Sequence, residues 1–381
     1  MEIKFNQITL ERPEARAKEP STDQPGDQNR LNRVEKTRTE ALKQADAIRE
    51  TLTLEEEKIL ALASRIHQRN LDRVYIVGCG DSWHVGNGVR YTMEQILGIP
   101  VEPMQALDFT LYYHKNVNEH TLVIGISSGG STPAVIDGMK EAHARGAFCL
   151  GLTNSPGSVI TEAFDGSLII HATRKGWPTQ ASTATMALIC KLTLALGRIN
   201  KAEGVAELEE GLEKLPQLIE MITPSSDSLM EKLARKLAYA RFLFFTGGGS
   251  NLAAAAMGGA KVKELCPIHA ATLPLEEFHH YRSLKPGDPL FIVAPDKASH
   301  QRAVDTAEVG RYDGGLIFAL VSEDEEEITG VAHWVYKLPQ MSDFIAPIVY
   351  CVPLHFFAYH LAKAKFDLGL GFIPAFPQEV A

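Results

Sequence analysis

Short, continuous apolar runs alternate along this chain with longer segments that carry apolar residues on one face only. The runs that predict buried strands are residues 73–80 (RVYIVGCG), 121–127 (TLVIGIS), 147–153 (AFCLGLT) and 166–172 (GSLIIHA). Helices are predicted at 82–98 and 133–146, because Pro133 suits a first helical turn and Gly98 and Gly146 suit helix ends. Buried strands separated by helices predict a parallel sheet that is covered by helices on both faces.

The segments before the first strand differ in composition. Residues 1–33 combine Pro, Gly and charged residues with few large apolar side chains, so we expect an N-terminal arm that is either flexible or docked on another surface. From Leu31 to about Gln68 the pattern is helical, charged and apolar on one face. It predicts two helices ahead of the first strand.

The chain also repeats itself. The segment YIVGCGDS (75–82) aligns with FFTGGGSN (244–251), and LVIGIS (122–127) aligns with LFIVAP (290–295) at nearly the same offset along the chain. Generic α/β patterning supplies part of this match, but the nearly constant offset indicates a duplicated unit. The predicted fold class is α/β, with two tandem, doubly wound, flavodoxin-like parallel-sheet domains. We expect a first domain with its leading helices at 34–200, a helical linker at 201–223 and a second domain at 224–381.

Charge and cysteine content narrow the class of protein. The 381 residues are 45% hydrophobic and carry a net charge of −9, without the clustered Lys and Arg that binding to nucleic acid requires. Five widely separated cysteines favour buried thiols in a reducing compartment over disulfides or a zinc site. We expect neither a leader peptide nor a membrane-spanning apolar run. A cytoplasmic location is therefore expected. The acidic run 322–330 is predicted to be a solvated loop.

Six small residues, SSGGST at 127–132, follow the strand predicted at 121–127. Ligands of open parallel sheets bind beyond the carboxyl ends of the strands, and this loop lies at such an end. Its hydroxyl and backbone donors, together with the N-terminus of the helix that Pro133 opens, suit a phosphate or a similar oxyanion. Ser131 or Thr132 is predicted to cap that helix. The alternative is a tight turn whose hydroxyls satisfy only local backbone groups.

Two further segments are expected to border the same site. CGDSWH (79–84) follows the first strand, and KGWPTQASTATMAL (175–188) leads into a helix for which Ser182 and Thr183 are plausible caps. The small-residue loop lacks the Gly-Lys-Ser/Thr of a Walker A motif, and GCGDSW lacks the third glycine of a dinucleotide fingerprint. Nucleotide binding is therefore disfavoured, and neither a cofactor nor a metal is expected.

In their order and spacing these motifs resemble the tandem sugar-isomerase (SIS) domain family. That family includes the isomerase half of glucosamine-6-phosphate synthase and stand-alone deaminases and deglycases. The resemblance covers about residues 34–363, and the matching segments are CGDSWH, ISSGGST, QASTATM, GGAKVKELCPIHA (258–270) and LEEFHHY (275–281).

The resemblance implies a role for several residues. It makes Ser82, Ser127, Ser128 and Thr132 the sugar-phosphate contacts and places Ser182 near the sugar. It makes Glu264 the catalytic base and His280 the group that assists ring opening, often in the site of a neighbouring subunit, so a homodimer with a shared site is implied. From the residues alone, Glu264 could instead be a helix-surface carboxylate paired with Lys261 or Lys263. His279 and His280 could likewise be a solvated pair in a loop.

The chain departs from the family at positions that bear on the anion. Gly129 stands where the family usually has a third anion-binding Ser, and Ser131 replaces its Glu. Tyr281 replaces the Gly that follows the histidine, the first residue after Met1 is not a catalytic Cys, and the family's C-terminal lysine motif is absent. The anion is therefore either a phosphate that is held differently or a sulfonate. The possible pocket residues that could compensate are Arg174, Lys175 and Trp177.

These observations predict an aldose–ketose isomerase that acts on a hexose 6-phosphate, or a similar anionic hexose, through an enediol intermediate. A single carboxylate beside C1 and C2 can move the carbon-bound proton, and a histidine titrates in the range that ring opening needs. Three alternatives stay open: a deaminase or deglycase of an amino-sugar or fructosamine phosphate, a sulfonated-hexose isomerase, and a non-catalytic sugar-phosphate sensor.

Overall fold

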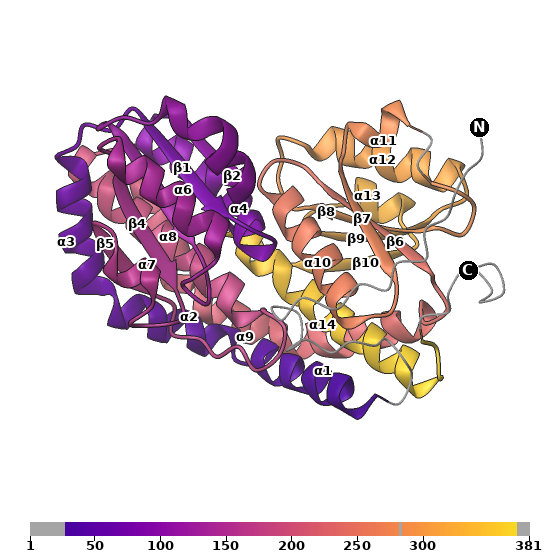
Figure 1. Ribbon diagram of the computed structural model, residues 1–381. Helices are drawn as coiled ribbons and strands as arrows, with labels where there is room; N and C mark the ends of the chain where they lie inside the picture. Colours follow the sequence, from indigo (N-terminus) through magenta and orange to yellow (C-terminus); the bar gives the residue numbers. More distant parts are fainter. Residues whose placement is uncertain (1–26, 282–283, 372–381) are drawn as a thin grey trace, which may run out of the picture.

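Two five-stranded parallel sheets form the centres of two lobes (Figure 1). The computed structural model describes residues 27–281 and 284–371, so most of the predicted arm and the last ten residues lie outside the described residues. The first sheet has the order β2-β1-β3-β4-β5, with β1 (Arg73–Gly78), β2 (Val101–Gln105), β3 (Thr121–Ile126), β4 (Phe148–Thr153) and β5 (Gly166–Ile169). The second has the order β7-β6-β8-β9-β10, with β6 (Phe242–Gly247), β7 (His269–Pro274), β8 (Pro289–Ala294), β9 (Leu316–Ser322) and β10 (Trp334–Leu338).

The two sheets have equivalent strand orders. Strand β6 occupies the place of β1 in its sheet, β8 that of β3 and β9 that of β4. The first two of these pairs are the strands that the internal repeat aligned, at nearly the same offset. The prediction of two tandem, doubly wound α/β parallel-sheet domains is confirmed.

Helices cover both faces of each sheet (Figure 1). Those of the first lobe are α4 (Asp81–Leu97), α5 (Ala106–Asp108), α6 (Pro133–Ala144), α7 (Val159–Glu162) and α8 (Gln180–Asn200), with two irregular turns, η2 (Phe109–Tyr113) and η3 (His114–Asn116). Those of the second lobe are α10 (Asn251–Leu265), α11 (Glu277–His280), α12 (His300–Tyr312), α13 (Glu327–Val331) and α14 (Ala346–Asp367). Helix α9 (Val205–Lys236) runs without a break from the first lobe into the second.

One face of each sheet contributes to a single core that both lobes share. Along β1, Val74 and Ile76 belong to this shared core, whereas Tyr75 and Val77 belong to a separate cluster under α6. In the second lobe Phe291 belongs to the shared core, and Ile292 belongs to the cluster under α12. Because alternate side chains of a strand are buried on opposite faces, these strands read as continuous apolar runs. The shared core fixes the two lobes against each other.

Two elements differ from the prediction for the first lobe. Strand β2 was not predicted, because Pro103 interrupts its pattern; the strand lies at the sheet edge, where the ladder tolerates proline. Three helices precede β1 rather than two: α1 (Gln28–Ala41), α2 (Gln44–Leu54) and α3 (Glu56–His67). The chain bends after Ala41 because α1 packs against α14 of the second lobe, whereas α2 packs against α8 and α9.

Helix α8 corrects another expectation. Among the described residues, it is the one helix that is long and apolar enough to span a membrane by length and composition, whereas no such run was expected. However, 83% of its most apolar window is buried inside the protein. Its neighbours are α2, α3 and α4, so its apolar character on all sides is that of a central core helix.

The acidic run at 322–330 is not simply a solvated loop. Glu325 is buried, and its carboxylate accepts hydrogen bonds from the backbone N–H groups of Ile328 (2.6 Å) and Thr329 (3.0 Å). These are N–H groups of the first turn of α13, which have no partner within the helix. The prediction is therefore wrong for Glu325, which caps a helix.

Helix α1 holds the loop at residues 173–177, which leads into α8. Glu40 is buried on α1, and its carboxylate accepts hydrogen bonds from Lys175 N (2.7 Å), Gly176 N (3.0 Å) and Thr173 Oγ1 (2.7 Å). One turn earlier, Thr37 Oγ1 accepts a hydrogen bond from Trp177 N (2.9 Å). A loop with few backbone partners of its own is thus held in one conformation by a helix from the start of the described chain.

We expect Glu40→Gln to destabilise the protein. The amide group would place a donor where two backbone N–H groups and a hydroxyl now find acceptors, and an unmet buried donor costs about 1–3 kcal/mol. The measurement is the free energy of unfolding from urea titration.

Glu35→Gln is the matched control on the same helix. Glu35 is exposed and accepts one hydrogen bond, from the hydroxyl of Tyr359 (3.0 Å), which the amide oxygen of Gln can still accept. Its effect should stay within about 0.5 kcal/mol. Equal losses in the two variants would contradict the role assigned to Glu40.

Candidate active site

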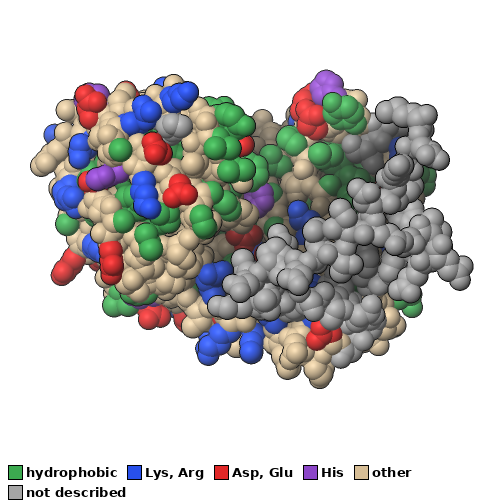
Figure 2. Space-filling model, viewed as in Figure 1, with side chains coloured by type: hydrophobic (Ala, Val, Ile, Leu, Met, Phe, Trp, Pro, Cys, Tyr) green, Lys and Arg blue, Asp and Glu red, His purple; other side chains and the backbone are tan. Residues whose placement is uncertain are grey.

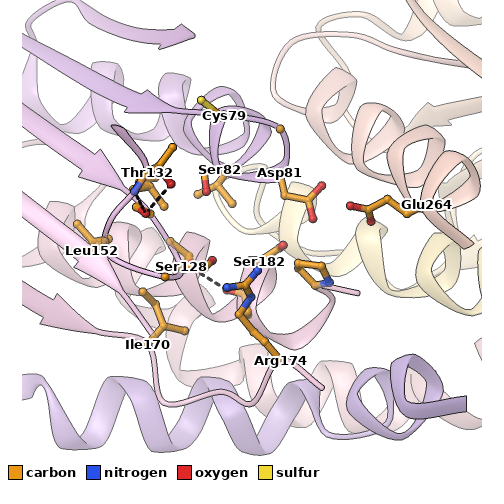
Figure 3. A pocket seen from close by; sticks show the side chains of 18 residues that line it. Cys79, Asp81, Ser82, Ser128, Thr132, Leu152, Ile170, Arg174, Ser182 and Glu264 are labelled. Carbon is orange, nitrogen blue, oxygen red and sulfur yellow. Dashed lines mark hydrogen bonds between the residues drawn. The ribbon is translucent and has the colours of Figure 1, made fainter. Parts of the chain in front are cut away.

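A cavity of about 260 Å³ lies at the carboxyl edge of the first sheet, facing the second lobe (Figure 3). The ends of β1, β3, β4 and β5 and the start of α8 supply nearly all of its walls, and Glu264 of α10 comes from the second lobe. Figure 2 shows the hollow between the lobes, where acidic, basic and histidine side chains are seen. The lining residues are Cys79, Gly80, Asp81, Ser82, Val85, Ile126, Ser127, Ser128, Gly129, Thr132, Leu152, Ile170, Arg174, Pro178, Ala181, Ser182, Thr185 and Glu264.

The loop at residues 127–132, called here the anion loop, turns its carbonyl groups away from the cavity. Ser127 O accepts a hydrogen bond from Gly130 N (2.8 Å), and Gly130 O accepts one from Ile160 N (3.0 Å). Ser128 O accepts three, from Thr153 Oγ1 (3.1 Å), Ser155 Oγ (3.0 Å) and Asn154 N (3.2 Å). With its carbonyls fixed in this way, the loop can present N–H groups to a ligand.

Several donors of the anion loop are available to a ligand. Within the described part of the chain, the backbone N–H groups of Ser128, Gly129 and Ser131 have no hydrogen-bond acceptor. Gly130 has φ +69°, a conformation that lets successive N–H groups converge on one point. Such a concavity at the N-terminus of α6 suits an oxyanion.

The hydroxyl of Thr132 does not cap α6 as predicted. Thr132 occupies the N-cap position, but its Oγ1 lies 2.8 Å from Ser127 Oγ, and Ser131 forms no cap either. Ser127 Oγ also accepts a hydrogen bond from Thr132 N (3.3 Å). The two hydroxyls therefore brace the ends of the loop against each other.

The start of α8 contributes Ser182 and Arg174 to the cavity. The helix begins at Gln180 with Thr179 as its N-cap, so Ser182 lies in the first turn and neither Ser182 nor Thr183 is the cap that was predicted. Figure 3 shows the side chain of Arg174 directed into the cavity from the loop before α8. Arg174 thus adds a permanent positive charge beside the anion loop.

Lys175 and Trp177, named as possible pocket residues, do not line the cavity. Lys175 is exposed. Trp177 is buried in the shared core beneath two cations of α1, with the guanidinium carbon of Arg33 4.2 Å and that of Arg30 5.4 Å from its ring centre. The prediction missed this because α1 arrives from another part of the sequence.

Three charged side chains meet where the lobes face each other. The ammonium of Lys261, whose side chain is 1% exposed, donates to Asp81 Oδ2 (2.6 Å) and to Glu264 Oε2. Glu264 is 35% exposed, and Figure 3 shows Glu264 and Asp81 approaching each other across the gap between the lobes. The pairing of Glu264 with Lys261 that the sequence left open is therefore present, but at the cavity wall and not on an exposed surface.

Asp81 was not singled out from the sequence. Its signal was its place in CGDSWH, directly after the first predicted strand. Asp81 is the first residue of α4 and lines the cavity next to Ser82. Its partner Lys261 is 180 residues away in the sequence, which no local pattern could reveal.

His280 lies outside the cavity. It ends α11 in the second lobe, its side chain is 62% exposed, and its Nε2 is 3.3 Å from Glu276 Oε1. Within one chain, therefore, the structure brings together Ser82, Ser127, Ser128, Gly129, Thr132, Ser182, Arg174 and Glu264, but not His280. Among the residues that the structure describes, no group of three or more His, Cys, Asp or Glu side chains could hold a metal ion.

Comparison with known proteins agrees with this geometry. Residues 66–197, which run from the end of α3 through most of α8, match the family model of the SIS domain. The chain belongs to the SIS domain family. It is 30% identical over 318 residues to the glutamine–fructose-6-phosphate aminotransferase [isomerizing] of Thermus thermophilus, an alignment that covers 81% of this chain and 52% of that protein. The chain thus spans about half the length of the curated relatives it matches.

Solved structures of related proteins share the fold. The C-terminal domain of glucosamine-fructose-6-phosphate aminotransferase from Francisella tularensis superposes with a TM-score of 0.76 at 20% identity, covering 86% of this chain and 96% of that one. Glucosamine-6-phosphate deaminase from Thermotoga maritima superposes with a TM-score of 0.66 at 17% identity, covering 90% and 95%.

Burial and neighbouring charges at this SIS site shift the pKa values of Glu264 and Lys261. Burial raises the pKa of Glu264 above its ordinary value of 4.5, and the charge of Asp81 raises it further, although Lys261 opposes both. Burial disfavours the charge of Lys261 as well, but Asp81 and Glu264 outweigh that effect and raise the pKa of the ammonium. The positive charge of Lys261 is therefore stabilised and is shared by the carboxyl groups of Asp81 and Glu264.

Arg30 and His355 lie near these groups, on α1 and α14. Arg30 Nη2 donates to the backbone O of Glu264 (2.8 Å), so α1 also holds the end of α10. His355 of α14 is fully buried, its Nδ1 lies 3.0 Å from Gln44 Oε1, and burial lowers its pKa to about 3. The imidazole is therefore neutral at physiological pH, so it adds no charge to that of Asp81, Lys261 and Glu264.

We expect Lys261→Met to destabilise the fold by about 2–4 kcal/mol at neutral pH. Removing one partner of a buried ion pair costs about 3–5 kcal/mol, and the partial exposure of Glu264 reduces that cost. Without the ammonium the pKa of Glu264 should rise further. A carboxyl group whose pKa is higher in the folded protein than in the unfolded chain stabilises the fold below its ordinary pKa of 4.5. This stabilisation is lost as the pH rises through the pKa of the folded state.

The measurement is urea unfolding of wild type and Lys261→Met at a series of pH values. The difference between the two should widen as the pH rises above 4.5. Lys263→Met is the matched control, because Lys263 is exposed on the same helix. A difference that stays constant with pH would contradict the assignment of Lys261 as the group that lowers the pKa of Glu264.

Proposed function

We propose that this SIS protein is an aldose–ketose isomerase that acts on a hexose with an anionic group at C6, through an enediol intermediate. The observation that supports this most directly is that one cavity contains the anion loop of the first lobe and Glu264 of the second. The two ends of a sugar phosphate need these two kinds of chemistry. The loop would bind the anion, and Glu264 would transfer the proton between C1 and C2.

The size and charge of the cavity support a small, anionic and polar substrate. Its volume of about 260 Å³ is slightly below the range of about 300 to 1,000 Å³ that is usual for ligand sites. Arg174 and the unpaired N–H groups of the anion loop supply positive potential at one end. The relative from Thermus thermophilus is named for fructose 6-phosphate and for isomerisation, which agrees with a hexose 6-phosphate as the substrate.

The protonation of Glu264 also suits this reaction. A base that removes a proton next to a carbonyl and returns it to the neighbouring carbon works best with a pKa near the operating pH. The raised pKa of Glu264 is a shift in that direction. Lys261 would stabilise the carboxylate and the developing charge on the sugar oxygens.

A role for His280 would require a second copy of the chain. His280 is exposed on the second lobe and does not reach the cavity of its own chain. If it assists ring opening as the family resemblance implies, a homodimer must bring it to the partner's cavity. The isomerase proposal does not depend on this step, because Glu264 and the anion loop meet within one chain.

Nitrogen release is the second candidate reaction. A deaminase or deglycase would use the same anion loop and the same Glu264 on an amino-sugar or fructosamine phosphate, and the Thermotoga maritima neighbour is named as a glucosamine-6-phosphate deaminase. Release of ammonium from glucosamine 6-phosphate, or of amino acid from a fructosamine 6-phosphate, would favour this reaction over isomerisation. A sensor would be stabilised by the sugar without turnover of any kind.

We expect Glu264→Gln to stop proton transfer but not binding. In D₂O, wild type should exchange the C2 hydrogen of glucose 6-phosphate or a C1 hydrogen of fructose 6-phosphate, and the variant should do so about 10²–10⁴-fold more slowly. Thermal stabilisation by the same sugars should persist, because the anion loop is unchanged. Asp137→Asn, an exposed acidic residue on α6, is the control. Unchanged exchange in Glu264→Gln would refute the proposed base.

The type of anion can be tested at Gly129. A Cβ built there meets no atom within 4 Å, so Gly129→Ser can add a hydroxyl to the anion loop without a clash. We expect it to bind inorganic phosphate about 10–100-fold more tightly, which is the effect of roughly one added hydrogen bond to a charged group. Calorimetric titration with phosphate and with methanesulfonate gives the preference for each anion.

Gly130→Ser serves as the contrasting variant. At Gly130 a Cβ would lie 1.9 Å from Ser158 Oγ, and φ is +69°, so the substitution should damage the loop and weaken binding of both anions. If Gly129→Ser leaves both affinities unchanged, position 129 does not face the anion.

A further inference from the structure

Isomerisation of a cyclic sugar needs proton transfers at oxygen as well as at carbon. Glu264 accounts for the carbon-bound proton, but the hydroxyl protons of O1 and O2 also have to move. The titratable side chains that line the cavity are Cys79, Asp81, Arg174 and Glu264. Of these side chains, Asp81 is the one that shares the Lys261 ammonium with Glu264.

Asp81 has the geometry of a second proton-transfer group. It is the first residue of α4, directly after the end of β1, and its side chain is 14% exposed. Its Oδ2 accepts the hydrogen bond from Lys261 (2.6 Å), while its Oδ1 accepts none from any described residue. Glu264 is held in the same way through Oε2, and its Oε1 is likewise without a partner among the described residues. Each carboxylate therefore has one anchored oxygen and one that is available to a ligand.

The two carboxylates lie at the same end of the cavity. Figure 3 shows Asp81 between the anion loop, represented by Ser128 and Thr132, and Glu264. Because one ammonium contacts both, their anchored oxygens lie on either side of a single nitrogen. A sugar held by its C6 anion in the loop would extend toward this pair with C1 and C2.

We propose that Asp81 transfers the protons of O1 and O2 while Glu264 transfers the carbon-bound proton, so that one chain supplies both acid–base groups. This inference rests on the proposed isomerase function. It differs from the family-based expectation, in which His280 assists ring opening.

The proton transfers balance over a full cycle. Asp81 starts as a carboxylate and Glu264 as a carboxylic acid. In ring opening, Asp81 takes the proton of O1, the C1–O5 bond breaks, and Glu264 gives its proton to O5. Glu264 then removes the proton from C2 while Asp81 protonates O1, which gives the enediol.

The second half of the cycle restores the starting state. Glu264 gives its proton to C1 while Asp81 takes the proton of O2, which leaves a C2 carbonyl. In ring closure O5 attacks C2, Glu264 takes the proton of O5, and Asp81 protonates O2. The pair holds one proton between the two groups whenever the cyclic sugars bind and leave, so no other acid or base is consumed.

Lys261 makes this state of protonation favourable. One ammonium with one carboxylate and one carboxylic acid has no net charge, which suits a site that is largely removed from solvent. Burial raises the pKa of Glu264, and the charge of Asp81 adds to this against the opposing effect of Lys261, which is why the proposed cycle places the proton on Glu264 at the start. Other groups that interact electrostatically with this trio are Arg33 of α1, His84 of α4, and Cys351 and His355 of α14, and Lys263 of α10 acts on His84.

The test compares Asp81→Asn, Asp81→Thr and His280→Asn with wild type, and Asp137→Asn serves as control. Asn preserves the shape of Asp81 and can still accept from Lys261, and Thr is smaller and neutral. The probes are glucose 6-phosphate and fructose 6-phosphate, with interconversion and solvent deuterium exchange as readouts. Thermal unfolding and binding of inorganic phosphate verify that each variant is folded with an intact anion loop.

We expect kcat to fall about 10²–10⁴-fold in both Asp81 variants, with KM within a few-fold of wild type and phosphate binding unchanged. His280→Asn should keep the wild-type rate. The wild-type pH profile of kcat should be bell-shaped, because the pair must hold one proton, and Asp81→Asn should lose the acid limb. A purely structural role for Asp81 would leave both limbs in place.

Three results would overturn the proposal: near wild-type kcat in a folded Asp81 variant, retention of the acid limb in Asp81→Asn, or a loss in His280→Asn as large as that in Asp81→Asn. In each case exchange by wild type would still support the isomerase function. If wild type exchanges no hydrogen of either sugar and interconverts neither, the proposed function itself fails, and this inference fails with it.

Discussion

A single buried ammonium joins the two lobes at the cavity. Lys261 contacts Asp81 from the first lobe and Glu264 from the second, and its own side chain is almost fully buried. This contact needs α4 to begin at the end of β1 and α10 to present Lys261 and Glu264 one turn apart. It also needs α10 to pass close to both α4 and α14. The Ala- and Gly-rich sequence of α10 permits this: Gly258 leaves no room for a Cβ beside Leu354 of α14, and Ala253 lies next to Gly88 of α4.

Helix α1 links the two ends of the cavity in a second, independent way. Through Glu40 it fixes the loop that carries Arg174, and through Arg30 it holds the backbone of Glu264. The same helix covers Trp177 with the guanidinium groups of Arg30 and Arg33. The separation of the anion loop from Glu264 therefore depends on side chains that do not line the cavity. A buried carboxylate that serves three donors, as Glu40 does, is hard to replace, because every donor would need a new acceptor.

The fold and half of the site were predictable from the sequence because they depend on local patterns. Buried strands read as apolar runs, and the anion loop is visible as small residues after β3. What the sequence could not show arises from contacts between distant segments. Lys261 reads as a surface lysine because its burial depends on Asp81 from the other lobe. Trp177 reads as a loop residue near the site because its cover comes from Arg30 and Arg33. Strand β2 was missed for a local reason, since Pro103 breaks the pattern that an edge strand can tolerate.

The duplicated lobes have not kept the same chemistry at equivalent places. The internal repeat that aligns β3 with β8 brings the anion loop onto PDKASH (295–300), which follows β8 as the anion loop follows β3. In this second loop the carboxylate of Asp296 already accepts hydrogen bonds from three nearby donors. They are Ser299 N (2.8 Å), Ser299 Oγ (2.9 Å) and Asn251 Nδ2 (2.9 Å).

The surroundings of this second loop reinforce the difference. The neighbouring cavity, of about 550 Å³, is lined by Glu207, Asp296, Asp324, Glu325, Glu326, Glu327 and Asp343, against Lys297 and His300. A phosphate would find few free donors and an unfavourable potential there. Of the two equivalent loops, the anion loop of the first lobe is therefore the one that we propose for the anion. The second lobe is free to contribute through α10, whose Lys261 and Glu264 reach across to the site of the first. This division explains why the cavity must lie between the lobes, and why the packing of α10 on α4 sets its geometry.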